Sequence, residues 1–181
     1  MKLTFETAPD AVNHVLCSKI PDVLRKSSAG RNAFDVSAVS IGALGPFPLY
    51  VADISASGAM SKPKFFAWRF LLLNGEFAIS AADVSNVEKD HLVLSSVHFG
   101  RGARKTQEGI RFAQSVAGGS ARMRLLSIPR MHMLVIWLLA RKTIFVITDA
   151  SENIIKLSRS EFIANLSERH ENQRRRRRLT N

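Results

Sequence analysis

Hydrophobic residues recur at helical spacing near the start of the chain. From Val12 to Leu24 they lie mostly three or four positions apart, which predicts a helix. Pro21 lies inside this stretch and is expected to kink or break the helix, because proline has no N–H to donate and its ring clashes with the preceding turn. Asp22 would then cap a second short helix, and residues 27–31 would form a loop.

Residues 34–99 carry a different pattern, in which β-rich runs alternate with turn residues. GALG at 42–45 is typical of a turn between two strands. Two further β-rich runs flank Asn74-Gly75, the residue pair that most readily forms a type I′ hairpin turn. HLVLSSVHF at 91–99 indicates another strand. The segment therefore predicts an antiparallel meander of about four or five strands.

An amphipathic helix is predicted over residues 101–117, with Gly118-Gly119 as its C-terminal stop. One face of this helix is small and apolar: Ala103, Thr106, Ile110, Ala113 and Ala117. The opposite face is charged and mostly basic: Arg101, Arg104, Lys105, Glu108 and Arg111. We expect the first face to pack on the sheet and the second to face solvent.

Three strands and a helix are predicted for the rest of the chain. The strands are ARMRLLSI, MHMLVIWLL and KTIFVIT, and the second is apolar on both faces, as in a central strand covered on both sides. Ser158 and Glu161 form a capping box, which starts a helix ahead of Phe162, Ile163 and Leu166. This helix runs toward an arginine tract near the C-terminus.

The order of these elements predicts the α+β class, with an antiparallel sheet of about six to eight strands and helices packed on it. Residues 1–168 would form a single domain. Residues 169–181 would form a basic, disordered tail, because the arginine tract has nothing apolar to bury and its charges repel one another.

The order of hairpin, strand and basic helix, followed by RLLSIPRMHMLVIWLLARKTIFVIT, resembles a pattern in uncharacterised small bacterial α+β proteins. In that pattern an Ile-Pro step joins one strand to an apolar strand with an aromatic end. The resemblance covers residues 65–149 and implies a fold but no known activity. Arg130, Met131 and His132 depart from it, because small apolar residues are expected at those positions.

The net charge of +11 is unevenly distributed along the 181 residues. Residues 1–100 carry nine Lys or Arg and nine Asp or Glu, whereas residues 101–142 carry nine basic residues against Glu108 alone. Residues 143–181 carry eight against five, and the excess comes from the arginine tract. Clustered charge of this kind focuses a field on a polyanion.

Composition excludes several classes of protein. The single cysteine, Cys17, excludes an internal disulfide framework and a cysteine-based zinc site. Glu6 and Asp10 interrupt the N-terminal segment where a secretory signal needs an apolar run. The longest apolar run, 131–140, is about half the length needed to cross a bilayer. We therefore expect no transmembrane segment and a cytoplasmic protein.

Residues 100–106, GRGARKT, follow a predicted strand and open a predicted helix, which is where phosphate-binding loops occur. The P-loop spacing fails, because Phe99 and Arg104 stand where its glycines would be. A looser anion site remains open, in which helix N–H groups act with Arg101, Arg104 and Lys105. The alternative is an ordinary basic solvent face.

Other candidate chemistry is sparse. His14 and Cys17 share a helix face, but we expect a small buried thiol beside a half-exposed histidine. His91, His98 and His132 lack metal-site spacing, and aspartates at expected strand ends suit turns: Asp53, Asp83 and Asp90. The sequence thus predicts no catalytic residue, metal or cofactor.

KFFAWRF at 64–70 combines aromatic and basic residues: Lys64, Phe65, Phe66, Trp68 and Arg69. A stacking platform for single-stranded nucleic acid needs aromatic side chains that are exposed beside cations. Because this stretch is apolar on both faces, the pattern favours burial in the core.

The C-terminal tract carries Arg169 and five consecutive arginines: Arg174, Arg175, Arg176, Arg177 and Arg178. Each guanidinium can pair with phosphate through two hydrogen bonds, so a polyanion is the expected partner. The same tract would also serve as a targeting signal for import into the nucleus, for secretion or for an anionic membrane.

Three functional hypotheses follow. The first is a non-enzymatic protein that binds nucleic acid or another polyanion through the basic helix, the tail, Arg122 and Arg124. The second is an adaptor or secreted effector that binds a protein partner and whose basic tail is a targeting signal. The third is a small enzyme with a pocket near residues 100–105 or near His132.

Overall fold

The computed structural model describes residues 3–27, 29–30, 41–88, 91–117, 120–148 and 153–179, with the side chains of Glu88 and of 177–179 excepted. The helices are α1 (Asp10–Lys26), α3 (Arg101–Val116), α4 (Arg159–Leu179) and the short 3-10 helix η1 (Pro129–Met131). The strands are β1 (Leu3–Thr4), β2 (Gly42–Val51), β3 (Lys64–Asn74), β4 (Phe77–Glu88), β5 (His91–Phe99), β6 (Ala121–Ile128), β7 (Met133–Leu139), β8 (Ile144–Thr148) and β9 (Ile154–Ser158).

The strands form one nine-stranded, mostly antiparallel sheet with the order β5-β4-β3-β2-β6-β7-β8-β9. The parallel pairing of β2 with β6 joins strands β2–β5 to strands β6–β9. The short β1 also pairs with β6 in parallel. The predicted α+β class is confirmed. The strand number is higher than predicted, because β1 and β9 were not recognised in the sequence.

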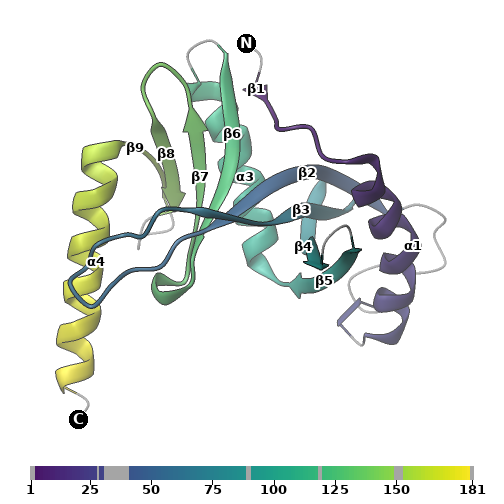
Figure 1. Ribbon diagram of the computed structural model, residues 1–181, viewed down its shortest axis with the longest axis horizontal. Coiled ribbons are helices and arrows are strands. Elements are labelled where there is room, and N and C mark those ends of the chain that lie inside the picture. Colours follow the sequence, from purple (N-terminus) through teal and green to yellow (C-terminus); the bar gives the residue numbers. More distant parts are fainter. Residues whose placement is uncertain are drawn as a thin grey trace.

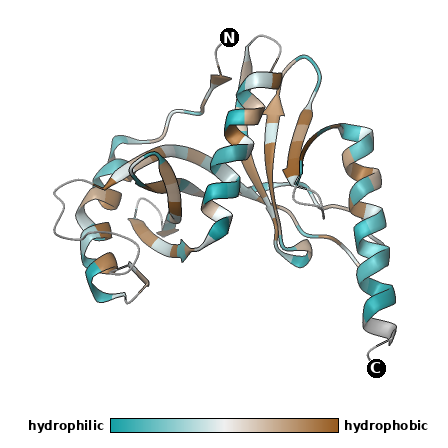
Figure 2. Ribbon diagram, turned by 180° about the vertical axis from the view of Figure 1, so that it is seen from behind, coloured by the Kyte–Doolittle hydropathy of each residue, from teal (hydrophilic) through white to brown (hydrophobic). Residues whose placement is uncertain are grey.

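The helices lie on both faces of the sheet. α3 packs on one face over a cluster that includes Ala67, Leu71, Met123 and Ile136, and this is the face in front in Figure 2. α1 and α4 lie at opposite ends of the molecule (Figure 1), each on its own hydrophobic cluster. Neighbouring residues of β6 point alternately to the α3 side and to the α4 side, and neighbouring residues of β3 point alternately to the α3 side and to the α1 side. Both α1 and α4 therefore cover the face opposite α3.

α1 corrects the expectation of a break at Pro21, since one helix runs from Asp10 to Lys26 with this proline inside it. Its inner stripe consists of Val12, Leu16, Ile20 and Leu24, each at most 5% exposed. The free energy gained by burying this stripe against the sheet outweighs the cost of Pro21, which removes one helical hydrogen bond and crowds the preceding turn.

The GALG segment is also not the turn that was predicted, because it belongs to β2. The register against β3 shifts between Leu44 and Phe47, which marks a bulge. Gly45 has φ +132°, and a side chain there would come within 2.9 Å of the Arg69 carbonyl oxygen. The predicted strand before residue 41 lies outside the described residues.

The hairpin at Asn74-Gly75 is confirmed. Asn74 pairs with Phe77, so the loop consists of Gly75 and Glu76, and Gly75 has φ +59°. Glycine at the first loop position is typical of type II′ rather than of the expected type I′. β2, β3, β4 and β5 then follow as the predicted antiparallel meander.

The predicted amphipathic helix and central strand are confirmed as α3 and β7. The expected inner residues of α3 are all buried, and Gly109 lets the helix approach β7 so closely that a side chain there would lie 2.7 Å from Ile136 Cδ1. Ile136 and Leu138 face α3, whereas Val135 packs with Phe162 of α4. The predicted stop at 118–119 lies outside the described residues.

α4 begins at the predicted capping box. The Ser158 N–H donates to Glu161 Oε2 at 2.7 Å, and the Glu161 N–H donates to Ser158 Oγ at 3.4 Å. The helix continues through the arginine tract to Leu179, so a disordered tail from residue 169 is not confirmed. Arginine is a good helix former, and the buried Phe162 and Leu166 anchor the first two turns. Of the described helices, none has an apolar stretch long enough to cross a membrane.

The capping box makes a testable prediction about pH. The hydrogen bonds from Ser158, through its side chain and its backbone, lower the pKa of Glu161 below its ordinary value of 4.5. This carboxylate therefore stabilises the folded helix above pH 4.5, and the contribution is lost as the pH falls through the lowered pKa. We expect the hydrogen-exchange protection of the Ser158 amide to fall across this interval. Glu161→Gln should remove the dependence, whereas Glu168→Gln should retain it; a dependence that persists in Glu161→Gln would contradict this origin.

Candidate functional site

The basic residues of α3 differ in their exposure and in their contacts. Arg101, Arg104 and Arg111 are exposed, whereas Lys105 is partly buried. Arg104 Nε forms an ion pair with Glu108 at 3.2 Å, and the Arg104 guanidinium lies 4.8 Å from the centre of the Phe77 ring. Glu108 therefore compensates the charge of Arg104, and the Phe77 ring packs against its guanidinium. Lys105 lines a pocket that none of these three arginines lines.

This pocket, here called the α3–α4 pocket, has a volume of about 340 Å³. Lys105 of α3, His132 after η1 and Arg169 of α4 line it, together with the polar Thr106 and Thr148. None of its described lining residues is acidic. The two places that the sequence offers for a pocket, residues 100–105 and His132, therefore contribute to the same cavity.

Local contacts constrain two of the three basic residues. His132 has φ +49° and its N–H donates to the Pro129 carbonyl at 3.0 Å, which holds the residue at the end of η1. Arg169 Nε donates to Asn165 Oδ1 at 2.8 Å. The first contact fixes the backbone of His132, and the second fixes the side chain of Arg169, in advance of any ligand.

A second pocket of about 270 Å³, here called the α4–arm pocket, is lined in part by the residues of α4 that follow Arg169. The arm is the segment 52–63 between β2 and β3, which reaches α4 (Figure 1). Ala56 of the arm and Gln173 line the pocket with three basic residues: Arg130, His170 and Arg174. Arg130 donates to the Ile54 carbonyl at 2.9 Å, which ties η1 to the arm.

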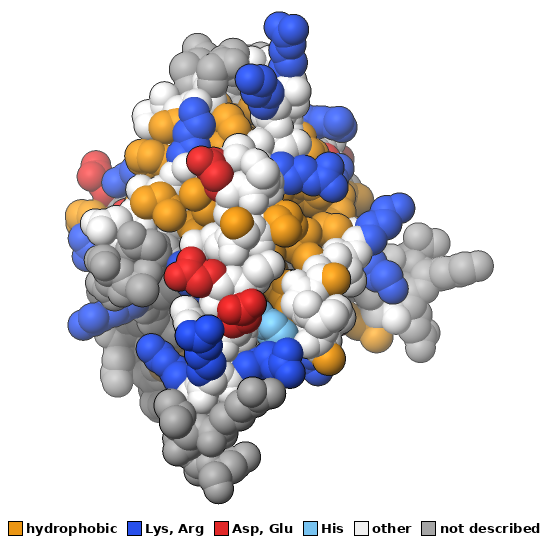
Figure 3. All heavy atoms as spheres, turned by 90° about the vertical axis from the view of Figure 1, so that its left-hand side faces the viewer, with side chains coloured by type: hydrophobic (Ala, Val, Ile, Leu, Met, Phe, Trp, Pro, Cys, Tyr) orange, Lys and Arg blue, Asp and Glu red, His pale blue; other side chains and the backbone are white. Residues whose placement is uncertain are grey.

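The two pockets together form what we call the basic cluster: Lys105, Arg130, His132, Arg169, His170 and Arg174. Figure 3 looks onto α4 and shows Lys and Arg side chains gathered toward its C-terminal end, with acidic side chains along the helix. Three segments that are distant in sequence supply the cluster. Such a set of donors can hold several phosphate oxygens at once.

The rest of the arginine tract extends this charge along α4. Arg175 and Arg176 are exposed, one turn or less beyond Arg174. The side chains of Arg177 and Arg178 lie outside the described residues.

Arg122 and Arg124 do not extend the basic face of α3. Met123 and Leu125 point toward α3, so the alternating Arg122 and Arg124 lie on the opposite face of the sheet. Arg124 forms an ion pair with Glu6, with Nε at 2.5 Å from Oε1. These two arginines therefore belong to a separate surface.

The expected burial of residues 64–70 is only partly right. Ala67 and Phe70 are buried, but Phe65 and Phe66 are 45% and 51% exposed. The register against β2 shifts between Leu49 and Tyr50, and the resulting irregularity breaks the alternation on which the expectation of burial rested.

The nucleophile and metal candidates gain no support. Cys17 is exposed rather than buried as expected, and His14, which was expected to be half-exposed, is exposed as well. Within the part of the chain that the structure describes, no group of three or more His, Cys, Asp or Glu side chains could hold a metal ion. Asp90 lies outside that part.

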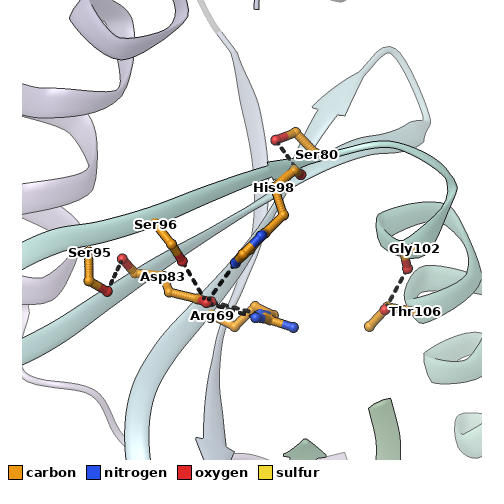
Figure 4. Close-up of polar contacts among 8 residues, drawn as sticks. All are labelled: Arg69, Ser80, Asp83, Ser95, Ser96, His98, Gly102 and Thr106. Carbon is orange, nitrogen blue, oxygen red and sulfur yellow. Dashed lines mark hydrogen bonds and ion pairs between the residues drawn. The ribbon is translucent and has the colours of Figure 1, made fainter. Parts of the chain in front are cut away.

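Asp83 is not at a strand end, as the sequence suggested, but within β4, where it is 1% exposed. Figure 4 shows its partners: Arg69 donates to both carboxylate oxygens at 2.7 Å, and Ser96 Oγ donates at 3.0 Å. His98 Nε2 lies 3.7 Å away and its side chain is 60% exposed. Because Arg69 compensates the carboxylate fully, the arrangement is that of a structural ion pair rather than a general base.

A third described pocket, of about 970 Å³, lies between the N-terminal segment, the start of β2 and α3. Its charged lining residues are mainly acidic: Glu6, Asp10 and Glu76 against Arg111. Its electrostatic character is therefore opposite to that of the basic cluster, and a polyanion would not enter it.

No protein-family model, no curated protein and no solved structure matches the chain. The resemblance of residues 65–149 to small bacterial proteins therefore stays a prediction.

Proposed function

We propose that this protein binds the phosphate backbone of nucleic acid without carrying out chemistry on it. The observation that supports the proposal is that six basic side chains, from α3, from η1 and the residue after it, and from α4, line two pockets. The described lining residues of the two pockets are otherwise neutral.

The geometry favours a polyanion over a single small anion. α4 contributes basic residues to both pockets, and exposed arginines continue beyond them along the helix, so contacts would repeat along an extended ligand. Contacts of this kind fix the position of a nucleic acid but do not read its sequence. Binding is therefore expected to be salt-dependent and to tolerate any sequence.

The proposal is tested with the triple variant Arg130→Gln, Arg169→Gln, Arg174→Gln. Each substitution removes one positive charge from the cluster, and the three together should weaken binding to a mixed-sequence oligonucleotide by about 10- to 100-fold at 0.1 M salt. Affinity is measured by fluorescence anisotropy with labelled DNA and RNA.

A charge-matched control is available on α1, at the far end of the molecule. Lys19→Gln, Arg25→Gln, Lys26→Gln also removes three exposed positive charges and should change affinity by less than about threefold. Equal losses in both triple variants would show that net charge alone drives binding, and would contradict a site on α4.

A further inference from the structure

A row of aromatic rings crosses the sheet face opposite α3. Trp68, Phe65, Tyr50 and Trp137 follow one another with ring centres 5.3, 5.7 and 5.9 Å apart. The row joins β3 and β2 to β7, and beyond Trp137 it continues into the buried Phe145 and Phe162. One end of the row is therefore anchored in the core and the other reaches the surface.

The surface end of the row is open. Phe65 is 45% exposed, and Tyr50, Trp68 and Trp137 are each partly exposed. Trp137 Nε1 is buried without a hydrogen-bond partner within the described residues, so the Trp137 end of the row is the enclosed one. Phe65, Tyr50 and Trp68 present surface on this face.

Cations lie beside the rings on the same face. The Arg124 guanidinium is 4.4 Å from the centre of the Tyr50 ring and 5.4 Å from that of Trp137. Arg122, two residues earlier on β6, points to the same side and is exposed. In Figure 3, hydrophobic side chains beside α4 are likewise bordered by Lys and Arg.

The row and the basic cluster are connected through the arm. β2 ends just after Tyr50, and β3 begins just before Phe65, so both rings stand at the base of the arm. The arm contributes Ala56 to the α4–arm pocket. A single extended chain could follow the arm from the aromatic row to the arginines of α4.

We propose that this aromatic row stacks on the bases of single-stranded nucleic acid, whose phosphates run on to the basic cluster. The inference rests on the proposed function and adds a preference for single strands. Bases in a duplex are already stacked on one another, whereas those of a single strand present free faces to aromatic side chains and arginine. The aromatic rings on this face would contact the bases of such a strand, and the cations beside them would contact its phosphates.

Glu6 is the one acidic group that contacts this surface among the described residues. It accepts hydrogen bonds from Arg124 and from the Tyr50 hydroxyl, at 3.2 Å for the latter. A phosphate would have to compete with this carboxylate for Arg124. Glu6→Gln should therefore strengthen binding to single strands by about three- to tenfold, the opposite of what loss of a structural contact would produce.

The test uses the two tryptophans of the chain, Trp68 and Trp137, which both lie in the row. Their fluorescence is followed during titration with oligothymidylate, with an abasic oligomer that has the same number of phosphates, and with duplex DNA. Stacked bases should quench the emission with oligothymidylate, and the abasic oligomer should bind through its phosphates with little quenching. Duplex DNA should bind more weakly than oligothymidylate.

Phe65→Ala should weaken binding of oligothymidylate by about tenfold and leave the abasic oligomer unaffected. Phe77→Ala is the matched control, because this ring is 49% exposed on the α3 side of the molecule. Equal binding and equal quenching by the two oligomers would overturn the inference while the proposed function stood. Failure of all three ligands to bind would overturn both.

Discussion

Asp83→Ala is expected to destabilise the protein by about 3–5 kcal/mol, because it leaves the Arg69 guanidinium without its partner inside the sheet. Asp83 is 1% exposed and accepts two hydrogen bonds from Arg69. The Arg69 side chain is itself only 14% exposed, so water cannot fully replace the carboxylate. The loss is measured by urea denaturation.

A double variant separates the cost of an unpaired charge from the value of the pair. Arg69→Met with Asp83→Leu removes both charges and should recover most of the stability lost in Asp83→Ala, since a buried ion pair is often no better than apolar packing. If Asp83→Ala lowered the free energy of unfolding by less than about 1 kcal/mol, the pair would not be buried as described.

Phe162→Ala is expected to cost about 3–5 kcal/mol through the loss of a buried aromatic ring. Phe162 is 0% exposed, and its ring stacks on that of Phe145 with centres 4.1 Å apart. With Leu166 it holds α4 on the sheet. Because α4 brings Arg169, His170 and Arg174 to the basic cluster, the variant should also bind nucleic acid more weakly.

Ile163→Ala is the control for Phe162→Ala. Ile163 is the next residue of α4, is 41% exposed and should cost less than about 1 kcal/mol when truncated. Thermal denaturation and amide hydrogen exchange along α4 measure both variants. Wild-type protection of α4 in Phe162→Ala would show that this ring does not anchor the helix.

The elements that could be predicted from sequence are those specified by local chemistry. A glycine with positive φ defines the β3–β4 hairpin, the Ser158–Glu161 pair starts α4, and a two-faced hydrophobic pattern identifies α3. In each case the signal lies within a few residues of the structure that it specifies. The same holds for β7, whose two apolar faces predicted its place between covering helices.

The errors arose where packing from distant segments overrides local preference. Pro21 is tolerated because the whole stripe from Val12 to Leu24 is buried against the sheet. The GALG segment stays in β2 because β3 pairs along it. β9 has only five residues and pairs with β8, which no local pattern reveals.

The candidate site was accessible to sequence analysis only in part. Lys105 and His132 were each considered, but their convergence depends on the sheet that brings η1 beside α3 and α4. Arg130 and His132 stand out in the sequence only against the expected resemblance of residues 65–149, which stays a prediction. The aromatic row had no such signal, because its rings come from three strands and a bulge exposes Phe65.

The central claim is that the basic cluster contacts the phosphates of nucleic acid, and the salt dependence of binding tests it most directly. The logarithm of the association constant for a single-stranded oligonucleotide is plotted against the logarithm of the salt concentration. Each lost phosphate contact reduces the slope by about 0.7, so Arg130→Gln, Arg169→Gln, Arg174→Gln should reduce it by about 2 relative to the wild type. An unchanged slope in this variant would show that these arginines do not contact the ligand, and would contradict the account.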